Sequence, residues 1–180
     1  MRKFEAVVEA VLRTEHVQSF VTSKVDGLEV DLGGIPGDRH YGLLRPADVR
    51  QKFYKRGTMI ANRRQLSLLS VEECAQVAAA LGIAEIRPEW LGANVLLRGY
   101  PELTQLPPGA RLLFESGAGI INEGENEPCT GPGRVIAEAV GDPSLTQRFV
   151  KAAWRKRGIV ASIELPGQLR AGDKVTVMVP

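Results

Sequence analysis

The sequence predicts a mainly β domain that is most economically closed as a barrel, with about three peripheral α-helices. Short apolar segments, several of them alternating with polar residues, are separated by glycine and proline turns, a spacing typical of barrels and sandwiches. Three modest segments carry apolar residues at helical spacing, and strands and helices do not alternate as in a parallel βαβ sheet. Closure into a barrel would leave no strand edge exposed.

The composition is that of a globular protein. The chain has 180 residues, 44% hydrophobic and 24% charged, and we expect residues 1–180 to form one domain. No run approaches the ~18 consecutive apolar residues of a membrane span, and charged residues interrupt the first 15 positions, so we expect neither a membrane segment nor a signal peptide. The two cysteines, Cys74 and Cys129, provide no disulfide framework. We therefore expect free thiols in a cytoplasmic protein.

The first third of the chain predicts two strands and a basic loop. Residues 4–12 suit a strand better than a short helix. Residues 28–32 alternate between apolar and acidic side chains, which predicts a half-buried strand that ends at Gly33 and Gly34. From residue 43 to residue 58 this pattern gives way to five basic residues around one acid, Asp48. Such a composition indicates an exposed loop.

The centre of the chain predicts a strand followed by a helix. Residues 65–69 can form a short strand, and the next four residues, Ser70 to Glu73, match the capping box that begins a helix. Apolar residues then recur at helical spacing until Gly82, which supplies the left-handed stop. Because Cys74 lies on the apolar face of this helix, we expect it in the core.

The last part of the chain returns to short strands. These are expected at residues 94–97, 111–114 and 120–122. A helix is predicted from about Arg134 to Val140, and a second one begins after Pro143 and carries its apolar pattern through Trp154 toward Gly158. Residues 159–165 and 174–179 are predicted to close the chain as a hairpin.

A glycine-punctuated turn at residues 34–42 is the first candidate site. It places Asp38, Arg39 and His40 side by side, so it can present both donors and acceptors to a ligand. Equally, Asp38 could cap backbone amides and pair with Arg39, which would make the turn purely structural. His40 could bind a metal, but the only other histidine is His16 and no C-x-x-C motif is present, so the number of ligands argues against an all-protein zinc site.

A cluster of cations follows. Asn62, Arg63 and Arg64 precede a predicted strand and, with the basic loop, could form a cationic pocket for phosphate, which guanidinium groups bind bidentately. A solvated basic face is the simpler interpretation of the charge. Single-stranded nucleic acid is a third one, because Tyr41, Phe53 and Tyr54 interleave with the basic residues. The net charge of +2 and the aromatic content of 6% argue against nucleic acid.

Cys129 is the strongest chemical candidate. It lies in a proline- and glycine-rich loop just before the predicted helix at Arg134, and a helix N-terminus favours the thiolate. The glutamates at positions 123, 125 and 127 oppose this effect unless they point away. A thiolate on a loop can act as a nucleophile or as a soft ligand for a transition metal. Unlike Cys74, Cys129 has no periodic apolar face, which favours a functional role.

Taken together and in order, these segments resemble the MOSC family, which is named for the C-terminal domain of molybdenum cofactor sulfurase. Each segment is weak alone, but their order and spacing are specific. They are GIPGDRHYG at 34–42, NRRQLSLLS at 62–70, LGANVLLRG at 91–99, the stretch 106–113, EPC at 127–129, and RGIVASI followed by LRAGDKVTV. The resemblance spans nearly the whole chain and implies a β-rich barrel like that of the pyruvate kinase barrel domain.

The resemblance also implies a cofactor. Cys129 is similar in position to the cysteine that binds the molybdenum of molybdopterin or carries a sulfur destined for it. The residues that would line the cofactor pocket are Gly37, Asp38, Arg39, His40, Asn62, Arg63, Arg64 and Asn94. In relatives that reduce N-hydroxylated compounds an arginine often stands two residues before the asparagine, where this chain has Gly92. That departure weakens the transfer of activity.

Two functions follow from the resemblance. The first is an oxidoreductase that reduces small N-hydroxylated compounds with Cys129 as molybdenum ligand. With two cysteines and no G-x-G-x-x-G fingerprint, such an enzyme would need a separate reductase as electron donor. The second is a sulfur carrier in which Cys129 takes a persulfide from a sulfur donor. No region resembles the pyridoxal phosphate domain of the sulfurases. A basic barrel that binds nucleic acid is a minor third possibility.

Overall fold

Strand β1 (Arg2–Thr14) is the longest element and organises the sheet. In the computed structural model, which describes residues 1–14, 16 and 18–180, the first half of β1 pairs with β12 (Lys174–Val179). The middle of β1 pairs with β7 (Val95–Arg98) and its end with β2 (Thr22–Val25), all antiparallel. Alternate side chains from Ala6 to Ala10 are buried, as period-two geometry requires, and the register shifts between Val8 and Ala10 where β1 pairs with β7. The predicted strand at residues 4–12 is therefore confirmed.

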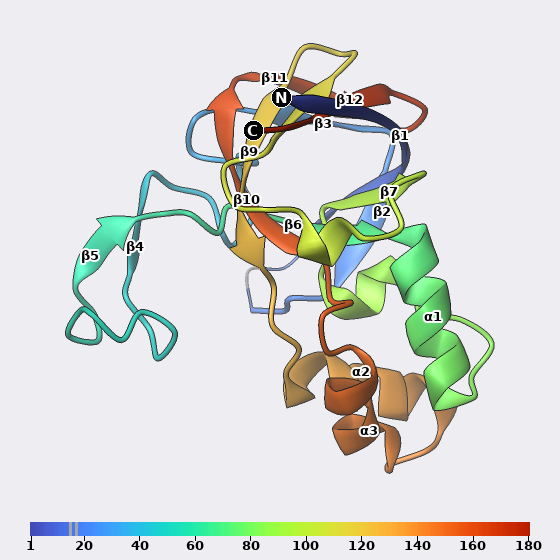
Figure 1. The fold of residues 1–180 in the computed structure, drawn as a ribbon. Helices are drawn as coiled ribbons and strands as arrows, with labels where there is room; N and C mark the ends of the chain where they lie inside the picture. The colour runs from blue at the N-terminus through green and yellow to red at the C-terminus, as the bar shows by residue number, and fades with distance from the viewer. Residues whose placement is uncertain (15, 17) are drawn as a thin grey trace.

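The pairing of β1 with β12 closes a barrel. Within the described residues the order around it is β12-β8-β9-β10-β6-β7-β1, so seven strands close on themselves and β2 extends the sheet beside β1 (Figure 1). The remaining strands are β6 (Leu66–Ser70), β8 (Arg111–Phe114), β9 (Gly119–Glu125) and β10 (Ile159–Leu165). Valine, leucine and isoleucine side chains from every strand fill the interior. The predicted mainly β barrel is confirmed.

Two short antiparallel strand pairs lie outside the barrel order. β3 (Gly27–Val30) pairs with β11 (Gly167–Arg170), and β4 (Leu44–Pro46) pairs with β5 (Met59–Ala61). The predicted C-terminal hairpin of residues 159–165 and 174–179 is wrong, because β10 pairs with β6 and β9 whereas β12 pairs with β1 and β8. The reason is β11, which lies between β10 and β12 in the sequence. Its Leu169 is fully buried in the barrel core, and the strand pairs with β3.

Helix α1 (Val71–Leu81) has the predicted bounds. The Ser70 hydroxyl accepts the Glu73 N–H at 3.3 Å, and Gly82 ends the helix with φ 71°. Only half of the capping box forms, because the Glu73 carboxylate turns to Thr104 instead. Cys74 is buried, as predicted. α1 and the 3-10 turn η1 (Pro88–Leu91) connect β6 to β7, which are parallel, so the fold contains one βαβ crossover that the sequence did not suggest.

Two further helices pack beside α1 (Figure 1). α2 (Thr130–Val140) begins four residues before the predicted start, because a proline is tolerated in a first helical turn. Gly133 in that turn lets the α2 backbone approach Thr146 of α3 (Leu145–Ala152) more closely than a Cβ would permit. α3 ends earlier than predicted, and Trp154 lies beyond it with an exposed ring. No helix in the described part of the chain is long and apolar enough to cross a membrane.

Glu73 is a buried carboxyl group between the helix layer and the barrel. Its oxygens accept hydrogen bonds from the backbone N–H and the hydroxyl of Thr104, which lies in the 3-10 turn η2 (Leu103–Gln105). The Thr104 hydroxyl in turn accepts the N–H of Gly158 at 2.7 Å. Burial raises the pKa of Glu73 to about 7 and outweighs the two donors. The folded state therefore favours the neutral carboxyl group.

We predict that Glu73 makes folding stability fall with rising pH. Because its pKa is raised from 4.5 to about 7 by folding, the stabilisation is complete below pH 4.5 and is lost as the pH rises through 7. Across that window the contribution of Glu73 to the free energy of unfolding should fall by roughly 3 kcal/mol. Urea unfolding at a series of pH values should show a flatter profile for Glu73→Gln. The exposed Glu138→Gln is the matched control, and equal profiles for wild type and Glu73→Gln would refute the assignment.

Candidate functional site

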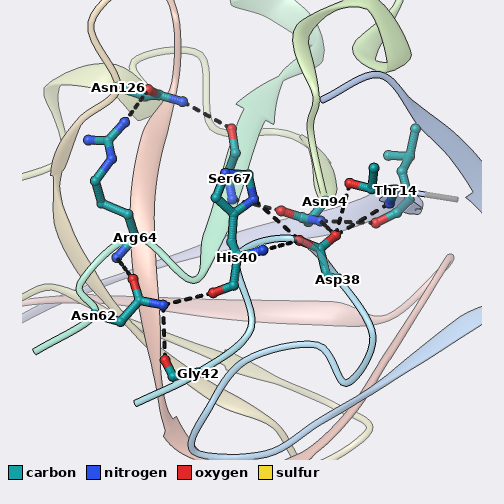
Figure 2. Close-up of polar contacts among 10 residues, drawn as sticks. Thr14, Asp38, His40, Gly42, Asn62, Arg64, Ser67, Asn94 and Asn126 are labelled. Atoms are coloured by element: carbon teal, nitrogen blue, oxygen red, sulfur yellow. Dashed lines mark hydrogen bonds and ion pairs between the residues drawn. The ribbon is translucent and has the colours of Figure 1, made fainter. Parts of the chain in front are cut away.

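The buried carboxylate of Asp38 anchors the turn that the sequence singled out (Figure 2). Its Oδ2 accepts hydrogen bonds from the N–H and the hydroxyl of Thr14, at 3.3 and 3.1 Å, and from Nδ2 of Asn94 at 3.4 Å. Its Oδ1 accepts the backbone N–H of His40 at 2.9 Å. Burial acts to raise the pKa of Asp38, but the donors from His40 and Thr14 outweigh it and lower the pKa to about 2. Asp38 is thus a structural anion, not a ligand-facing one.

Asp38 also orients the imidazole of His40. Nδ1 of His40 lies 3.2 Å from Oδ1 of Asp38, and an ionised carboxylate can only accept there, so we assign the proton to Nδ1. Nε2 is then the ring nitrogen left for other partners. The ring is half-exposed. The contact with Asp38 therefore fixes the orientation of an imidazole that could exchange a proton through Nε2.

Asn62 fastens the same turn to the segment between β5 and β6. Its Nδ2 donates to the carbonyl oxygens of His40 and Gly42, at 2.7 and 2.9 Å, and its Oδ1 accepts the N–H of Arg64 at 3.1 Å. The Arg64 guanidinium continues the network by donating to Oδ1 of Asn126 at 3.0 Å (Figure 2). One amide side chain thus fixes His40 and Arg64 relative to each other.

Cys129, His40 and Arg64 line one cavity of about 220 Å³. Cys129 is exposed and is the N-cap residue of α2, with extended backbone and no capping hydrogen bond from its side chain. The thiol therefore lies at the end of a helix whose first N–H groups are unpaired and carry partial positive charge. The other residues around the cavity are Phe20, Arg50, Leu66, Ser67, Leu91, Gly92, Asn126, Glu127, Gly131, Pro132, Arg157 and Val160.

Arg157 is the buried cation of this set, and it was not singled out from the sequence. It lies between α3 and β10 and is only 6% exposed. Nη2 donates to the carbonyl oxygen of Leu91 at 2.6 Å, whereas Nη1 is buried without a hydrogen-bond partner among the described residues. Burial lowers the pKa of Arg157 to about 10, and the nearby Cys129 acts in the opposite direction. A buried cation with a free donor points to an anionic ligand.

The charges around the cavity reinforce this conclusion. Three guanidinium groups, those of Arg50, Arg64 and Arg157, face one carboxylate, Glu127. Burial and the like charges of Arg50 and Arg45 lower the pKa of Arg64 to about 10. Of the other glutamates before Cys129, Glu123 accepts a hydrogen bond from Ser162 and pairs with Arg63. The cavity therefore has an excess of positive charge.

A second hollow of about 550 Å³ adjoins the first and shares Phe20, His40, Arg50 and Arg64 with it. Arg39 and Asn62 line only this outer hollow. Because His40 lines both, it stands where a ligand in the inner cavity would meet a molecule in the outer one.

The structure divides the predicted site residues into two groups. Cys129, His40 and Arg64 line the inner cavity, with Arg39 and Asn62 beside it. The others line neither hollow: Gly37, Asp38, Arg63 and Asn94. Asp38 and Asn94 support the site through hydrogen bonds, and Asn94 also accepts the N–H of Ser67. The Arg63 side chain is 75% exposed and pairs with Glu123 at 3.6 Å, so of the two candidate arginines only Arg64 faces the cavity.

Comparison with known proteins agrees with this fold. The MOSC domain family matches residues 37–176. YuaD of Bacillus subtilis strain 168, whose name provisionally connects it with metal-sulfur cluster biosynthesis, is 49% identical over 161 residues, 89% of this chain and 84% of YuaD. The crystal structure of Bacillus subtilis YuaD covers 99% of this chain and 98% of its own, with a TM-score of 0.95 and 44% identity.

A more distant structure shares the fold alone. YiiM from Geobacillus stearothermophilus has a TM-score of 0.58 at 12% identity and covers 96% of this chain and 73% of its own. The family match, which spans most of the chain, and the YuaD identity both bear out the family resemblance seen in the sequence. The chain belongs to the MOSC domain family.

Proposed function

We propose that the protein binds the molybdenum cofactor in the inner cavity, with Cys129 as the sulfur ligand of the metal, and reduces small N-hydroxylated compounds. One observation carries the proposal: the exposed thiol of Cys129, at the N-terminus of α2, shares a cavity with the unpaired Nη1 of the buried Arg157. A thiolate suits a soft transition metal, and an unpaired guanidinium donor suits a phosphate oxygen. The molybdenum cofactor contains both a transition metal and a phosphate group.

The residues around the cavity fit such a group. Arg64 and Arg157 are desolvated cations held by hydrogen bonds to Asn126 and Leu91, so each keeps further N–H donors in a fixed orientation. The first turn of α2 adds backbone donors beside the thiol. Together they would hold the phosphate of the cofactor while Cys129 holds the metal.

Gly92 stands where the N-hydroxy-reducing relatives often have an arginine, but the cavity of this chain still contains a cation there. A Cβ at Gly92 would lie 2.6 Å from the carbonyl oxygen of Phe20, and the residue has φ 64°, so an arginine cannot stand there without a shift of the backbone. The guanidinium of Arg157 binds the carbonyl oxygen of the preceding residue, Leu91, and so enters the same neighbourhood from another segment. In this chain Arg157 would replace the arginine of the N-hydroxy-reducing relatives.

Reduction of an N-hydroxylated compound to the amine consumes two electrons and two protons and releases water. The molybdenum cofactor, when bound, supplies two-electron chemistry. His40 can take up a proton at Nε2 and deliver it toward the cavity, because Asp38 holds the ring through Nδ1. The outer hollow gives space for the substrate beside His40. The electrons would come from a separate reductase.

A second candidate is sulfur transfer, which the name of YuaD favours. In this role the Cys129 thiolate attacks the outer sulfur of a donor persulfide, the S–S bond of the donor breaks, and the donor leaves as a thiolate. The accessible thiol at a helix N-terminus suits this exchange as well.

We predict that Cys129→Ala loses the cofactor metal. Protein purified from a host that makes the cofactor should contain molybdenum and pterin, and the Cys129→Ala variant should contain at least about tenfold less molybdenum, because no other exposed thiol is present among the described residues. Metal analysis and pterin fluorescence measure both. Cys74→Ala, which removes the buried thiol, is the control. A wild-type protein without molybdenum and pterin would falsify the cofactor proposal.

We predict that Arg157→Met lowers the pterin content of the purified protein at least about tenfold, because the cavity loses its buried cation. Arg155→Met removes an exposed arginine two residues away and should retain full content. Thermal unfolding of each variant separates loss of binding from loss of fold. Unchanged pterin content in a folded Arg157→Met would show that this guanidinium does not hold the cofactor.

Repeated turnover separates the two functions. With hydroxylaminopurine and a chemical reductant, the cofactor-loaded protein should form many product molecules per protein if it is a reductase. A sulfur carrier should give none and should instead gain the mass of one sulfur atom at Cys129 after exposure to a persulfide donor. The expected result is turnover that is lost in Cys129→Ala and slowed by His40→Asn. Sulfur loading without turnover would favour the carrier.

A further inference from the structure

An arm of residues 43–61, made of β4, β5 and the loop between them, stands away from the barrel (Figure 1). It carries five basic residues and one acid, a formal net charge of +4. Because the whole chain has a net charge of +2, the remainder of the molecule is at −2. The net positive charge of the protein is therefore carried by one projecting element.

The arm is held in one shape by Asp48. Its carboxylate accepts hydrogen bonds from Nη2 of Arg45 at 2.6 Å and from Nη1 and the backbone N–H of Arg50 at 3.1 and 2.8 Å. The donors from both arginines lower the pKa of Asp48 to about 2 against the opposing effect of its partial burial. Backbone hydrogen bonds between Ala47 and the returning chain at Thr58 and Gly57 close the loop. A preorganised loop loses little entropy when it binds.

The tip of the arm presents cations and apolar side chains together. Lys52, Lys55 and Arg56 are exposed and make no ion pair within the described chain. Between them lies Phe53, which is 97% exposed, and Val49 nearby is 70% exposed. Aromatic side chains surrounded by arginine and lysine are typical of protein interfaces, where a ring anchors the contact and the charges select the partner.

The root of the arm is part of the wall of the site. Arg45, Asp48 and Arg50 line the outer hollow, and Arg50 also lines the inner cavity together with Cys129. A molecule bound to the tip is thus connected to the site through one hydrogen-bonded element. A molecule docked on the arm is therefore held by the same element whose root lines both hollows.

We propose that the arm docks an acidic protein surface, with Phe53 as the apolar anchor and Lys52, Lys55 and Arg56 as the charges that select it. That the docked protein is the electron donor rests on the function proposed above. The charge distribution favours a compact acidic patch over an extended polyanion, because nucleic acid or an anionic bilayer would continue past the short arm onto the negatively charged remainder.

A photo-crosslinking amino acid at Tyr54, introduced in the cells from which the protein comes, tests the proposal. The crosslinked protein is identified, purified and titrated against the wild type and two variants at low and high salt. The first variant is Lys52→Glu/Lys55→Glu/Arg56→Glu, and the second, with the same charge change on exposed lysines elsewhere, is Lys3→Glu/Lys151→Glu/Lys174→Glu. A crosslinker at the exposed Trp154, outside the arm, controls for chance contacts.

The expected result is one acidic protein captured at position 54 and not at position 154. Its affinity should fall at least about tenfold in the arm variant and with rising salt, and should stay within about twofold in the control variant. Phe53→Ser should also weaken binding. A captured protein without an acidic surface, equal affinity for both charge variants, or no capture overturns the proposal. So does arm-dependent binding of oligothymidylate or phosphatidylglycerol vesicles in place of the protein.

Different measurements would contradict the docking proposal and the cofactor proposal. The arm variant changes no residue of either hollow, so it should keep its molybdenum and pterin content. Cys129→Ala should keep its affinity for the acidic protein, because Cys129 lies outside the arm. A wild-type protein that binds the partner but holds no cofactor would refute the proposed function and leave the docking surface standing.

Discussion

The site depends on one buried carboxylate, that of Asp38. A charge removed from water is costly unless donors surround it, and here the donors come from three segments far apart in the chain: Thr14 at the end of β1, Asn94 before β7, and His40 in its own turn. The barrel therefore holds the turn in place, and the turn holds the imidazole. His40 owes its orientation to contacts with strands that themselves carry no chemistry.

The part of the cavity wall that carries Arg157 has its own fixed point at the next residue, Gly158. Its φ is 77°, and a Cβ there would collide with the carbonyl oxygen of Leu68 in β6. Only glycine therefore fits at this position. The N–H of Gly158 donates to Thr104, and its carbonyl oxygen accepts the N–H of Asn126. These bonds fix the backbone next to Arg157. The buried Glu73, bound to the same Thr104, links this wall to α1.

Local patterns in the sequence predicted what local physics determines. The bounds of α1 followed from its capping serine and Gly82, and the strands followed from alternation. Pairing is non-local, so the sequence could not show that β12 meets β1 at the other end of the chain. Arg157 was missed for the same reason. Its burial and its Nη1 without a partner among the described residues result from tertiary packing, and the signal in the sequence was a charged residue two positions before a buried strand. That Cys129 binds molybdenum stays a prediction.

The buried cations of the inner cavity reduce the stability of the folded protein. Folding lowers the pKa of Arg64 and of Arg157 to about 10, so at neutral pH each charged guanidinium is less favourable in the folded protein than in the unfolded chain. A sequence selected for stability alone would replace such cations with apolar residues. An anion that binds between them removes this cost and stabilises the folded state by mass action, in proportion to its concentration relative to its Kd. Arg50, which belongs to both the cavity and the arm, would join such an anion site to the proposed docking surface.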